Sequence, residues 1–191
     1  MKENLRTALL MTLVTTVIFG VVYPLGVTGL AQLLFPAQAN GSFIQIKGQL
    51  VGSALLGQSF TSPQYFHSRP SAAGTGYDAS QSGASNFGPT NHQLFDRVKA
   101  DVDRLHAENP GSAIPVDLVT ASGSGLDPEI SIAAAQFQVA RVARARGMRE
   151  AEVRALVDKH TLKRQFGFLG EPRVRVLELN LELDATHPMP R

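Results

Sequence analysis

A long gap in charge near the N-terminus is the feature that most constrains how this chain can fold. After Arg6 no charged side chain appears until Lys47, and residues 8–35 are almost all apolar, glycine, threonine or glutamine. As a helix, about 28 such residues would extend roughly 42 Å, which exceeds the ~30 Å hydrocarbon core of a bilayer. The sequence therefore predicts a transmembrane helix over 8–35, with a kink at Pro24, where the ring removes a helix hydrogen bond.

The alternative for this segment is a cleaved export signal. Lys2 and Arg6 give a basic start, and Ala37-Gln38-Ala39 fits the small-x-small pattern that signal peptidases accept. The apolar core of a signal peptide is usually about 7–15 residues long, roughly half of what is present here. Hydrophobic length therefore favours an uncleaved anchor.

The charges that flank the apolar segment predict its orientation. Lys2, Arg6 and the terminal amine precede it, opposed only by Glu3, whereas the stretch from Pro36 to Gln45 carries no charge. The positive-inside bias places residues 1–7 in the cytoplasm and exports the rest. We therefore expect a single-pass protein of the plasma (inner) membrane, with an extracytoplasmic (periplasmic) domain that spans 36–191.

Composition narrows the class of this outer domain. The chain has no cysteine, so an apolar core rather than disulfides must stabilise the domain. Its 18 Lys and Arg against 16 Asp and Glu give a net charge of only +2, whereas a nucleic-acid-binding protein normally shows a clear basic excess. We expect no nucleic acid as a partner. The histidines lack metal-ligand spacing, so no metal site is expected either.

Turn signals and apolar periodicity predict an α+β domain. The expected elements are strands at 42–46, 49–51, 116–120 and 173–184, and helices at 94–105, 131–147 and 150–160. Asp127 or Ser131 is expected to cap the second of these helices, and Gly147 to end it. The apolar phase of the last strand shifts near Leu177, which indicates a bulge. Strands, helices and a final strand without βαβ alternation are typical of the α+β class.

The segment from Gly57 to Asn91 has no helical period and is rich in Gly, Ser, Pro and Asn. A stretch of about 35 such residues within a domain is usually either disordered or a functional loop. Disordered segments are poor in aromatic residues, but this one contains Phe60, Tyr65, Phe66, Tyr77 and Phe87. We therefore predict an ordered functional loop.

Two short motifs suggest catalysis but lack essential parts. Gly52–Ser59 has the spacing of a phosphate-binding loop, yet Gln58 stands where that motif has its lysine. Ser122–Gly125 lacks the spacing of a hydrolase nucleophile, and no histidine lies near it in sequence. A tight turn, or a nest of backbone amides that could hold an anion, is the simpler interpretation. A membrane-anchored extracytoplasmic hydrolase is thus a distant alternative, and we expect no catalytic residues.

Several charged side chains have a structural explanation. Asp78 and Asp127 are expected to accept backbone amides in a turn or at a helix cap. A cluster of arginines near a helix end suits the helix dipole and predicts a solvated face, with an anionic lipid surface or acidic partner as the alternative. These arginines are Arg141, Arg144, Arg146 and Arg149.

Small residues in the membrane segment predict a helix partner. Gly20, Gly26 and Gly29, around Pro24, would let another membrane helix approach closely. The residues alone thus predict an anchored external domain that is attached to another membrane protein.

The loops carry a resemblance to a known family. The chain resembles the C subunit of the bacterial Kdp-type, ATP-driven high-affinity potassium transporter, and the similarity runs from the anchor to the tail. The segments that carry it are 52–53, 57–60, 65–71, 76–78, 82–91, 119–128, 138–143 and 176–180. Glu129 stands where this family often has histidine, and Ala84 and Phe87 replace a glycine and a leucine. The missing histidine argues against an obligatory acid–base role at that position.

The resemblance implies a small subunit of a multi-subunit potassium pump. Its partners would be a channel-like potassium-translocating subunit, a P-type ATPase subunit phosphorylated on aspartate, a small single-helix subunit and membrane lipids. The complex would use ATP, Mg and potassium, and this chain would bind no cofactor itself. The expected role is accessory and non-catalytic, in assembly, stability and access of the ion to the channel-like subunit.

The resemblance also implies which residues touch partners. Helix packing is assigned to Gly20, Pro24, Gly26 and Gly29. Partner contacts are assigned to Tyr65, Phe66, His67, Arg69, Tyr77, Asp78, Asn86, Asn91, Ser124 and Asp127. In an alternative role, as a catalytic chaperone that raises the ATP affinity of the ATPase subunit, Gln58 would contact the nucleotide.

Overall fold

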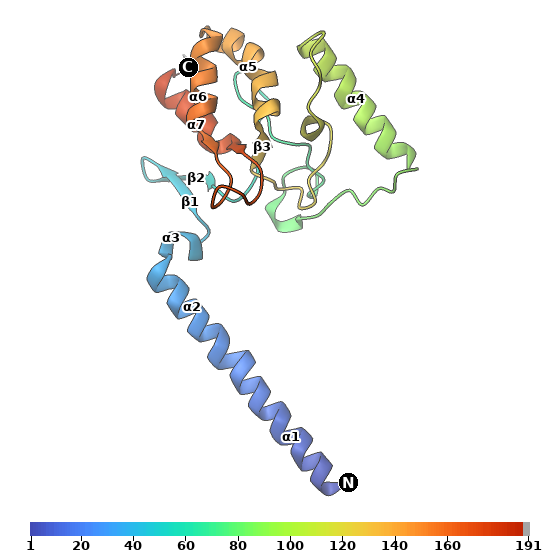
Figure 1. Cartoon of the computed structure of the whole chain (residues 1–191), viewed down its shortest axis with the longest axis vertical. Helices are drawn as coiled ribbons and strands as arrows, with labels where there is room; N and C mark the ends of the chain where they lie inside the picture. Colours follow the sequence, from blue (N-terminus) through green and yellow to red (C-terminus); the bar gives the residue numbers. More distant parts are fainter. Residues whose placement is uncertain (189–191) are drawn as a thin grey trace. The chain divides into compact units, whose positions relative to one another are not determined.

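A computed structural model describes residues 1–188 of the 191-residue chain, so the last three residues of the predicted outer domain lie outside it. The chain divides into two units, one over residues 1–53 and one that begins at Ala54 (Figure 1). The first unit contains a long helix and a β-hairpin, and the described part of the second contains four helices and a small sheet. This confirms the predicted long apolar helix followed by a mixed helix and sheet domain.

The N-terminal helix is continuous but changes its winding in the middle. It consists of α1 (Lys2–Val17), a π-helical turn (Ile18–Val22) and α2 (Tyr23–Leu34). The N–H of Tyr23 donates to the carbonyl of Ile18, five residues earlier. Pro24 has no N–H for the carbonyl four residues before it, and a π turn just ahead of the proline accommodates that missing bond. The irregularity predicted at Pro24 therefore lies one turn before it.

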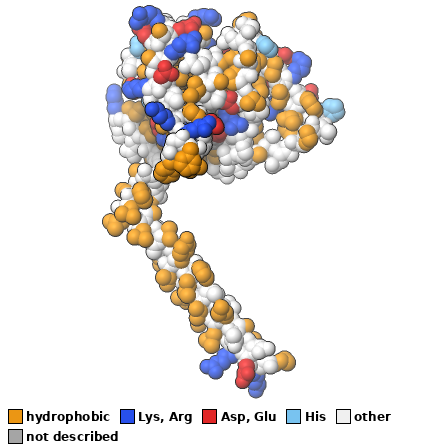
Figure 2. Space-filling model, viewed as in Figure 1, with side chains coloured by type: hydrophobic (Ala, Val, Ile, Leu, Met, Phe, Trp, Pro, Cys, Tyr) orange, Lys and Arg blue, Asp and Glu red, His pale blue; other side chains and the backbone are white. Residues whose placement is uncertain are grey.

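The length and composition of this helix suit a bilayer. It extends over 33 residues from Lys2 to Leu34, and an 18-residue stretch within it has a mean hydropathy of 2.1 and no residue buried within the chain. Among the described residues it is the one helix long and apolar enough to cross a membrane. Figure 2 shows hydrophobic side chains along it, with charged side chains at its N-terminal end.

A short helix and a hairpin complete the first unit. The helix α3 (Pro36–Ala39) precedes β1 (Phe43–Ile46) and β2 (Gln49–Ser53), which pair antiparallel. Lys47 and Gly48 form the turn with φ values of 50° and 79°. Positive φ at both central residues is typical of tight hairpin turns. The predicted hairpin is confirmed.

The described part of the second unit contains four helices and a three-stranded antiparallel sheet of order β3-β5-β4, and the helices α5 and α7 contact that sheet. The helices are α4 (His92–Glu108), α5 (Ile132–Arg146), α6 (Glu150–Lys159) and α7 (Val176–Thr186). The strands are β3 (Glu129–Ser131), β4 (Thr161–Leu162) and β5 (Arg173–Arg175), and two 3-10 helices, η2 (Ala79–Gln81) and η3 (Val116–Leu118), lie in the connections.

The predicted ends of α5 are confirmed. Ser131 caps it, since its Oγ accepts the N–H of Ala134 at 3.0 Å. The helix ends at Gly147, whose φ of 64° is the left-handed conformation that glycine adopts without strain. The helices predicted around Leu94–Leu105 and Glu150–His160 are confirmed as α4 and α6.

The strand predicted at 116–120 is wrong, because this segment forms η3. Leu118 and Val119 donate to carbonyls three residues earlier, and Thr120 Oγ donates to the carbonyl of Val116. Both oxygens of Asp117 accept from Ser131, its N–H at 2.7 Å and its Oγ at 3.0 Å. These bonds satisfy the segment without a strand neighbour, and five residues of which only three are apolar form too short a pattern to distinguish the two states.

The strand predicted over Arg173–Asp184 is also wrong beyond its start. Only 173–175 form β5, and Val176 begins α7. The phase shift near Leu177, interpreted as a bulge, is the change from strand to helix. The buried residues of α7 are spaced i, i+1, i+3, i+4 and i+7, which is a helical face. They are Val176, Leu177, Leu179, Asn180 and Leu183.

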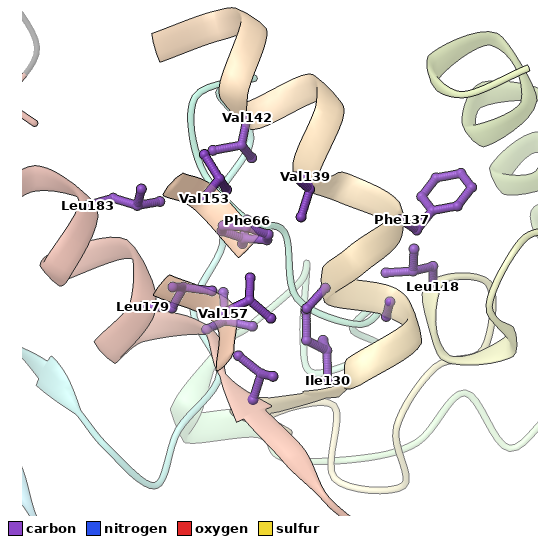
Figure 3. Packing of buried hydrophobic residues seen from close by; sticks show 14 of the residues in the cluster. Phe66, Leu118, Ile130, Phe137, Val139, Val142, Val153, Val157, Leu179 and Leu183 are labelled. Atoms are coloured by element: carbon purple, nitrogen blue, oxygen red, sulfur yellow. The ribbon is translucent and has the colours of Figure 1, made fainter. Parts of the chain in front are cut away.

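The core lies where α5, α6 and α7 meet around Phe66. Figure 3 shows this ring between valines of α5 and α6 and leucines of α7. Phe66 is fully buried although it belongs to the long loop rather than to a helix or strand. The loop is therefore part of the core of the second unit.

Candidate functional site

The long loop from Gly57 to Asn91 contains one short 3-10 helix and is otherwise irregular. Its backbone groups nevertheless have defined partners on α5, α7 and the turn from Ser122 to Asp127. The prediction of an ordered loop is confirmed. The loop and the turn, which the sequence could not connect, form one assembly.

Two buried side-chain amides hold the loop at Phe66 and His67. Asn180 Oδ1 accepts the N–H of Phe66 at 2.8 Å, and Asn180 Nδ2 donates to its carbonyl at 2.9 Å. Gln138 does the same for His67, at 2.8 and 3.1 Å. Both amides are 1% exposed, so each buried polar group has the partner it requires. Each amide thus binds both the N–H and the carbonyl of one loop residue, as the backbone of a neighbouring strand would.

Two arginines of α5 hold the preceding residues of the loop. Arg141 donates to the carbonyls of Pro63 and Tyr65, at 2.6 and 2.8 Å, and pairs with Glu108 at 2.7 Å. Arg146 donates to the carbonyl of Gln64 at 2.7 Å.

Arg146 is the more enclosed of the two. Its side chain is 0% exposed, pairs with Asp184 at 2.7 Å and lies over the ring of Tyr65, whose hydroxyl also donates to Asp184. The solvated arginine face predicted from the sequence is therefore wrong for Arg141 and Arg146, because both point into the loop. Arg144 and Arg149 are exposed.

His67 lies in a partly buried position beside these charges. Burial and the positive charge of Arg141 lower its pKa, and its Nε2 lies 3.0 Å from the carbonyl of Ser62. Glu108, which raises the pKa, and Arg104, which lowers it, are the other charged groups nearby. The folded protein therefore favours a neutral imidazole.

The unfolding free energy should consequently fall at acidic pH. A histidine with a lowered folded pKa binds fewer protons when folded, so stability is present above the ordinary pKa near 6.5 and is lost below it. His160 has a lowered pKa from burial as well, and contributes in the same window. We expect the thermal midpoint of the full chain in detergent to fall from pH 7.5 to 5.5, and less so in the double variant His67→Gln/His160→Gln. An equal fall in both proteins would contradict this assignment.

The loop and the turn bind each other through backbone groups, and we call this arrangement the loop clasp. Gly57 donates its N–H to the carbonyl of Leu126 at 2.8 Å. Gly83 donates its N–H to the carbonyl of Ser124 at 2.8 Å, and Ser71 Oγ donates to the carbonyl of Gly125 at 2.5 Å. Three carbonyls of the turn thus each accept from a different part of the loop.

Close packing explains two glycines of the clasp. A Cβ at Gly57 would lie 2.5 Å from the carbonyl oxygen of Asp127. A Cβ at Gly125 would lie 2.6 Å from the N of Ala73 and 2.7 Å from the carbonyl oxygen of Gly83, and its φ is +68°. Distances under 3.0 Å to backbone atoms leave no room for a side chain, so these positions require glycine.

An ion pair reinforces the clasp. Arg69 Nη1 lies 2.9 Å from Asp127 Oδ2, and both side chains are partly exposed. Asp127 Oδ1 accepts the N–H of Glu129 at 3.0 Å, which confirms the backbone role predicted for this aspartate. Glu129 in turn pairs with Arg173 at 2.6 Å and Arg175 at 3.4 Å on β5. Glu129 therefore has a structural role, because its ion pairs join β3 to β5.

Tyr77 and Asp78 lie in the second half of the loop. The hydroxyl of Tyr77 donates to the carbonyl of Arg69, and burial raises the pKa of Tyr77 to about 12. Asp78 caps η2, since it accepts the N–H and Oγ of Ser80, and these bonds lower its pKa. The predicted capping role of Asp78 is confirmed.

The remaining predicted residues lie along the same loop. Asn86 is exposed with φ of 52°, a conformation that asparagine tolerates. Asn91 caps α4 by accepting the N–H of Gln93 at 2.8 Å. Ser124 is exposed, and Gln58 is half-buried beside Gly57. The chain after Gln58 is irregular rather than helical, so the segment lacks the helix N-terminus of a phosphate-binding loop.

Two cavities adjoin the clasp. One of about 610 Å³ lies between η3, β3 and residues 165–173, and both Arg69 and Asp127 line it. Another of about 350 Å³ is lined by His67, Tyr77 and acidic and basic residues of α4.

Four residues hold the loop without having been predicted to do so from the sequence, namely Gln138, Asn180, Arg141 and Arg146. A signal was present, because Gln138 and Asn180 are polar residues inside otherwise apolar helix faces. Such residues require a hydrogen-bond partner when buried.

Comparison with known proteins places this architecture in a family. The profile described as "KdpC: K+-transporting ATPase, c chain" matches residues 5–185, which include the apolar helix and the whole loop clasp. The chain belongs to the KdpC family. The potassium-transporting ATPase KdpC subunit of Koribacter versatilis is 63% identical over 190 residues, covering 100% of this chain and 98% of the relative.

Other members of the KdpC family are similar over their full length. The subunit of Caulobacter vibrioides is 57% identical over 189 residues, covering 98% of this chain and 96% of its own length. That of Rhodospirillum rubrum is 56% identical over 191 residues, with 99% coverage of both chains. The resemblance noted from the loops is therefore confirmed, and the chain is a subunit of a Kdp potassium-transporting ATPase.

Proposed function

We propose that this chain is a non-catalytic accessory subunit, anchored by α1 and α2 in the plasma membrane with its second unit outside the cytoplasm. The observation that carries the proposal is the full-length family match, which includes both the apolar helix and the clasp. The loop makes internal bonds throughout the clasp, which supports a fixed recognition surface rather than a catalytic centre. Such a surface contributes to assembly and stability of the pump.

The membrane helix is the first part of the proposed interface. A Cβ at Gly26 or Gly29 would meet nothing within 4 Å, and one at Gly20 would meet only Thr16. Helices that carry small residues can approach each other closely in a bilayer. We propose that the helix packs on the channel-like subunit at these small residues.

The outer part of the interface is the exposed side of the clasp. Tyr65, His67, Tyr77 and Asp78 are partly exposed on a loop that two helices hold rigid, so the loop loses little conformational entropy on binding, whereas Phe66 is fully buried and supports the loop from the core. We propose that this surface lies near the external ion entrance of the channel-like subunit, with the P-type ATPase subunit as the hydrolytic partner. ATP, Mg and potassium are then handled by the complex.

The second candidate is a catalytic chaperone in which Gln58 contacts ATP. Gln58 follows Gly57, which the clasp fixes against Asp127, so its position is defined. The two functions require opposite sides of the membrane, because ATP is cytoplasmic.

Single cysteines distinguish the two functions, since the chain has none of its own. Ser59 and Ser124 are both exposed. We expect Ser59→Cys and Ser124→Cys in intact cells to react with a membrane-impermeant maleimide without lysis. Reaction only after lysis, in folded and assembled protein, would reverse the orientation and favour the chaperone role. A cysteine in place of Thr7, at the predicted cytoplasmic end, is the control that should react only after lysis.

A further inference from the structure

The connection between β4 and β5 carries three exposed apolar side chains at its tip, and we call these three residues the apolar tip. Phe166 is 87% exposed, Phe168 70% and Leu169 46%. Figure 2 shows hydrophobic side chains gathered over this loop of the second unit. Single exposed apolar residues are ordinary, but adjacent aromatic residues at a loop end require an explanation.

The fold holds this tip in place. The backbones of Gln165 and Leu169 exchange two hydrogen bonds of 2.9 Å, and Arg164 pairs with Glu171 at 2.6 Å across the base. Phe166 has φ of 53°, which is uncommon for a bulky residue. The loop therefore keeps its aromatic side chains turned outward rather than folding them onto the domain.

The charge around the tip is basic. Lys163 is exposed and makes no ion pair with any other described residue, whereas the acid of the loop, Glu171, is neutralised by Arg164. Aromatic side chains beside a free cation are typical of protein segments that enter the headgroup region of anionic bilayers.

The size of the tip argues against a protein partner. Its three side chains expose on the order of 400 Å². A stable protein interface buries about 800 Å² on each partner. Insertion into lipid has no such minimum when the domain is already held near the membrane.

The covalent anchor supplies that proximity. Between Leu34 and Ala54 lie about 19 residues, which reach at most roughly 65 Å even when fully extended. A tether of this length raises the effective concentration of the bilayer for a weak binding element.

We propose that the apolar tip of Phe166, Phe168 and Leu169 inserts into the lipid headgroup region of the membrane that anchors the chain. The inference rests on the proposed anchoring by α1 and α2. Insertion would give the outer unit a second attachment and so restrict its orientation above the bilayer.

The absence of tryptophan in the chain allows a direct test. The full chain is reconstituted in nanodiscs of phosphatidylglycerol and phosphatidylcholine with brominated acyl chains, which quench tryptophan on contact. Phe168→Trp reports on the tip and Phe166→Trp is a second reporter. Phe19→Trp reports on the anchor, and Phe95→Trp, on α4 and 59% exposed, is the matched surface control.

We expect blue-shifted, quenched emission from the tip reporters and from Phe19→Trp, and unquenched emission from Phe95→Trp. Quenching of Phe19→Trp without quenching of either tip reporter overturns the insertion and leaves the anchor intact. No quenching at any position overturns the anchor and the inference with it. A tip reporter that becomes protected only in the assembled pump, and stays unquenched there, overturns insertion in favour of a subunit contact.

Discussion

Gly125→Ala should destabilise the second unit by about 3 kcal/mol. The new Cβ would lie 2.6 Å from the N of Ala73 and 2.7 Å from the carbonyl oxygen of Gly83, and neither backbone atom can move without opening the clasp. The left-handed φ of +68° adds about 1–2 kcal/mol for any L-residue with a Cβ, and overpacking typically adds about 1–3 kcal/mol. For a domain of this size the thermal midpoint should fall by about 10 °C.

Gly123→Ala is the matched control in the same turn. A Cβ at Gly123 would meet nothing within 4 Å, so its thermal midpoint should stay close to that of the native chain. Both variants are measured as the full chain in detergent, and then for co-purification with the other subunits. Equal stability of the two variants would show that the turn can move enough to accept a side chain at position 125, which would contradict the close packing of the clasp. Loss of co-purification in Gly125→Ala alone would connect the clasp to assembly.

The parts of this fold that follow local rules were predictable from the sequence. The charge gap predicted the long apolar helix, and Lys47-Gly48 predicted the hairpin. Ser131 and Gly147 predicted the two ends of α5. Each signal lies within a few residues of the element that it determines. The order of the long loop was also predictable, because its aromatic content is incompatible with a solvated chain.

The predictions were wrong where contacts between residues far apart in the sequence determine the local structure. Residues 176–183 fit both a shifted strand and a helix, and burial of one face against α6 selects the helix. Arg141 and Arg146 fit a solvated helix end until the loop is placed beside them. The pairing of the loop with the turn depends largely on backbone carbonyls of the turn, which have no signature in the side-chain sequence. Only the glycines at 57 and 125 point to it, and only once their neighbours are known.

Arg146→Met should also cost about 3 kcal/mol, although methionine keeps much of the unbranched stem of the side chain. Arg146 is 0% exposed and donates to Asp184, to the carbonyl of Gln64 and to the carbonyl of His187. Removing one partner of a buried ion pair typically costs about 3–5 kcal/mol, since the other groups lose their partner. Asp184 is 42% exposed and can recover water, which places the cost at the lower end.

Arg144→Met is the control on the same helix, because Arg144 is exposed and should tolerate the change within about 0.5 kcal/mol. Arg146→Lys should fall between the two, since an ammonium cannot reproduce the planar guanidinium that donates in three directions. The measurement is the free energy of unfolding of the full chain in detergent. If Arg146→Met matched Arg144→Met, the arginine would be dispensable for holding the loop. The order Arg144→Met, Arg146→Lys, Arg146→Met, from most to least stable, would instead show that α5 fixes the loop through this guanidinium.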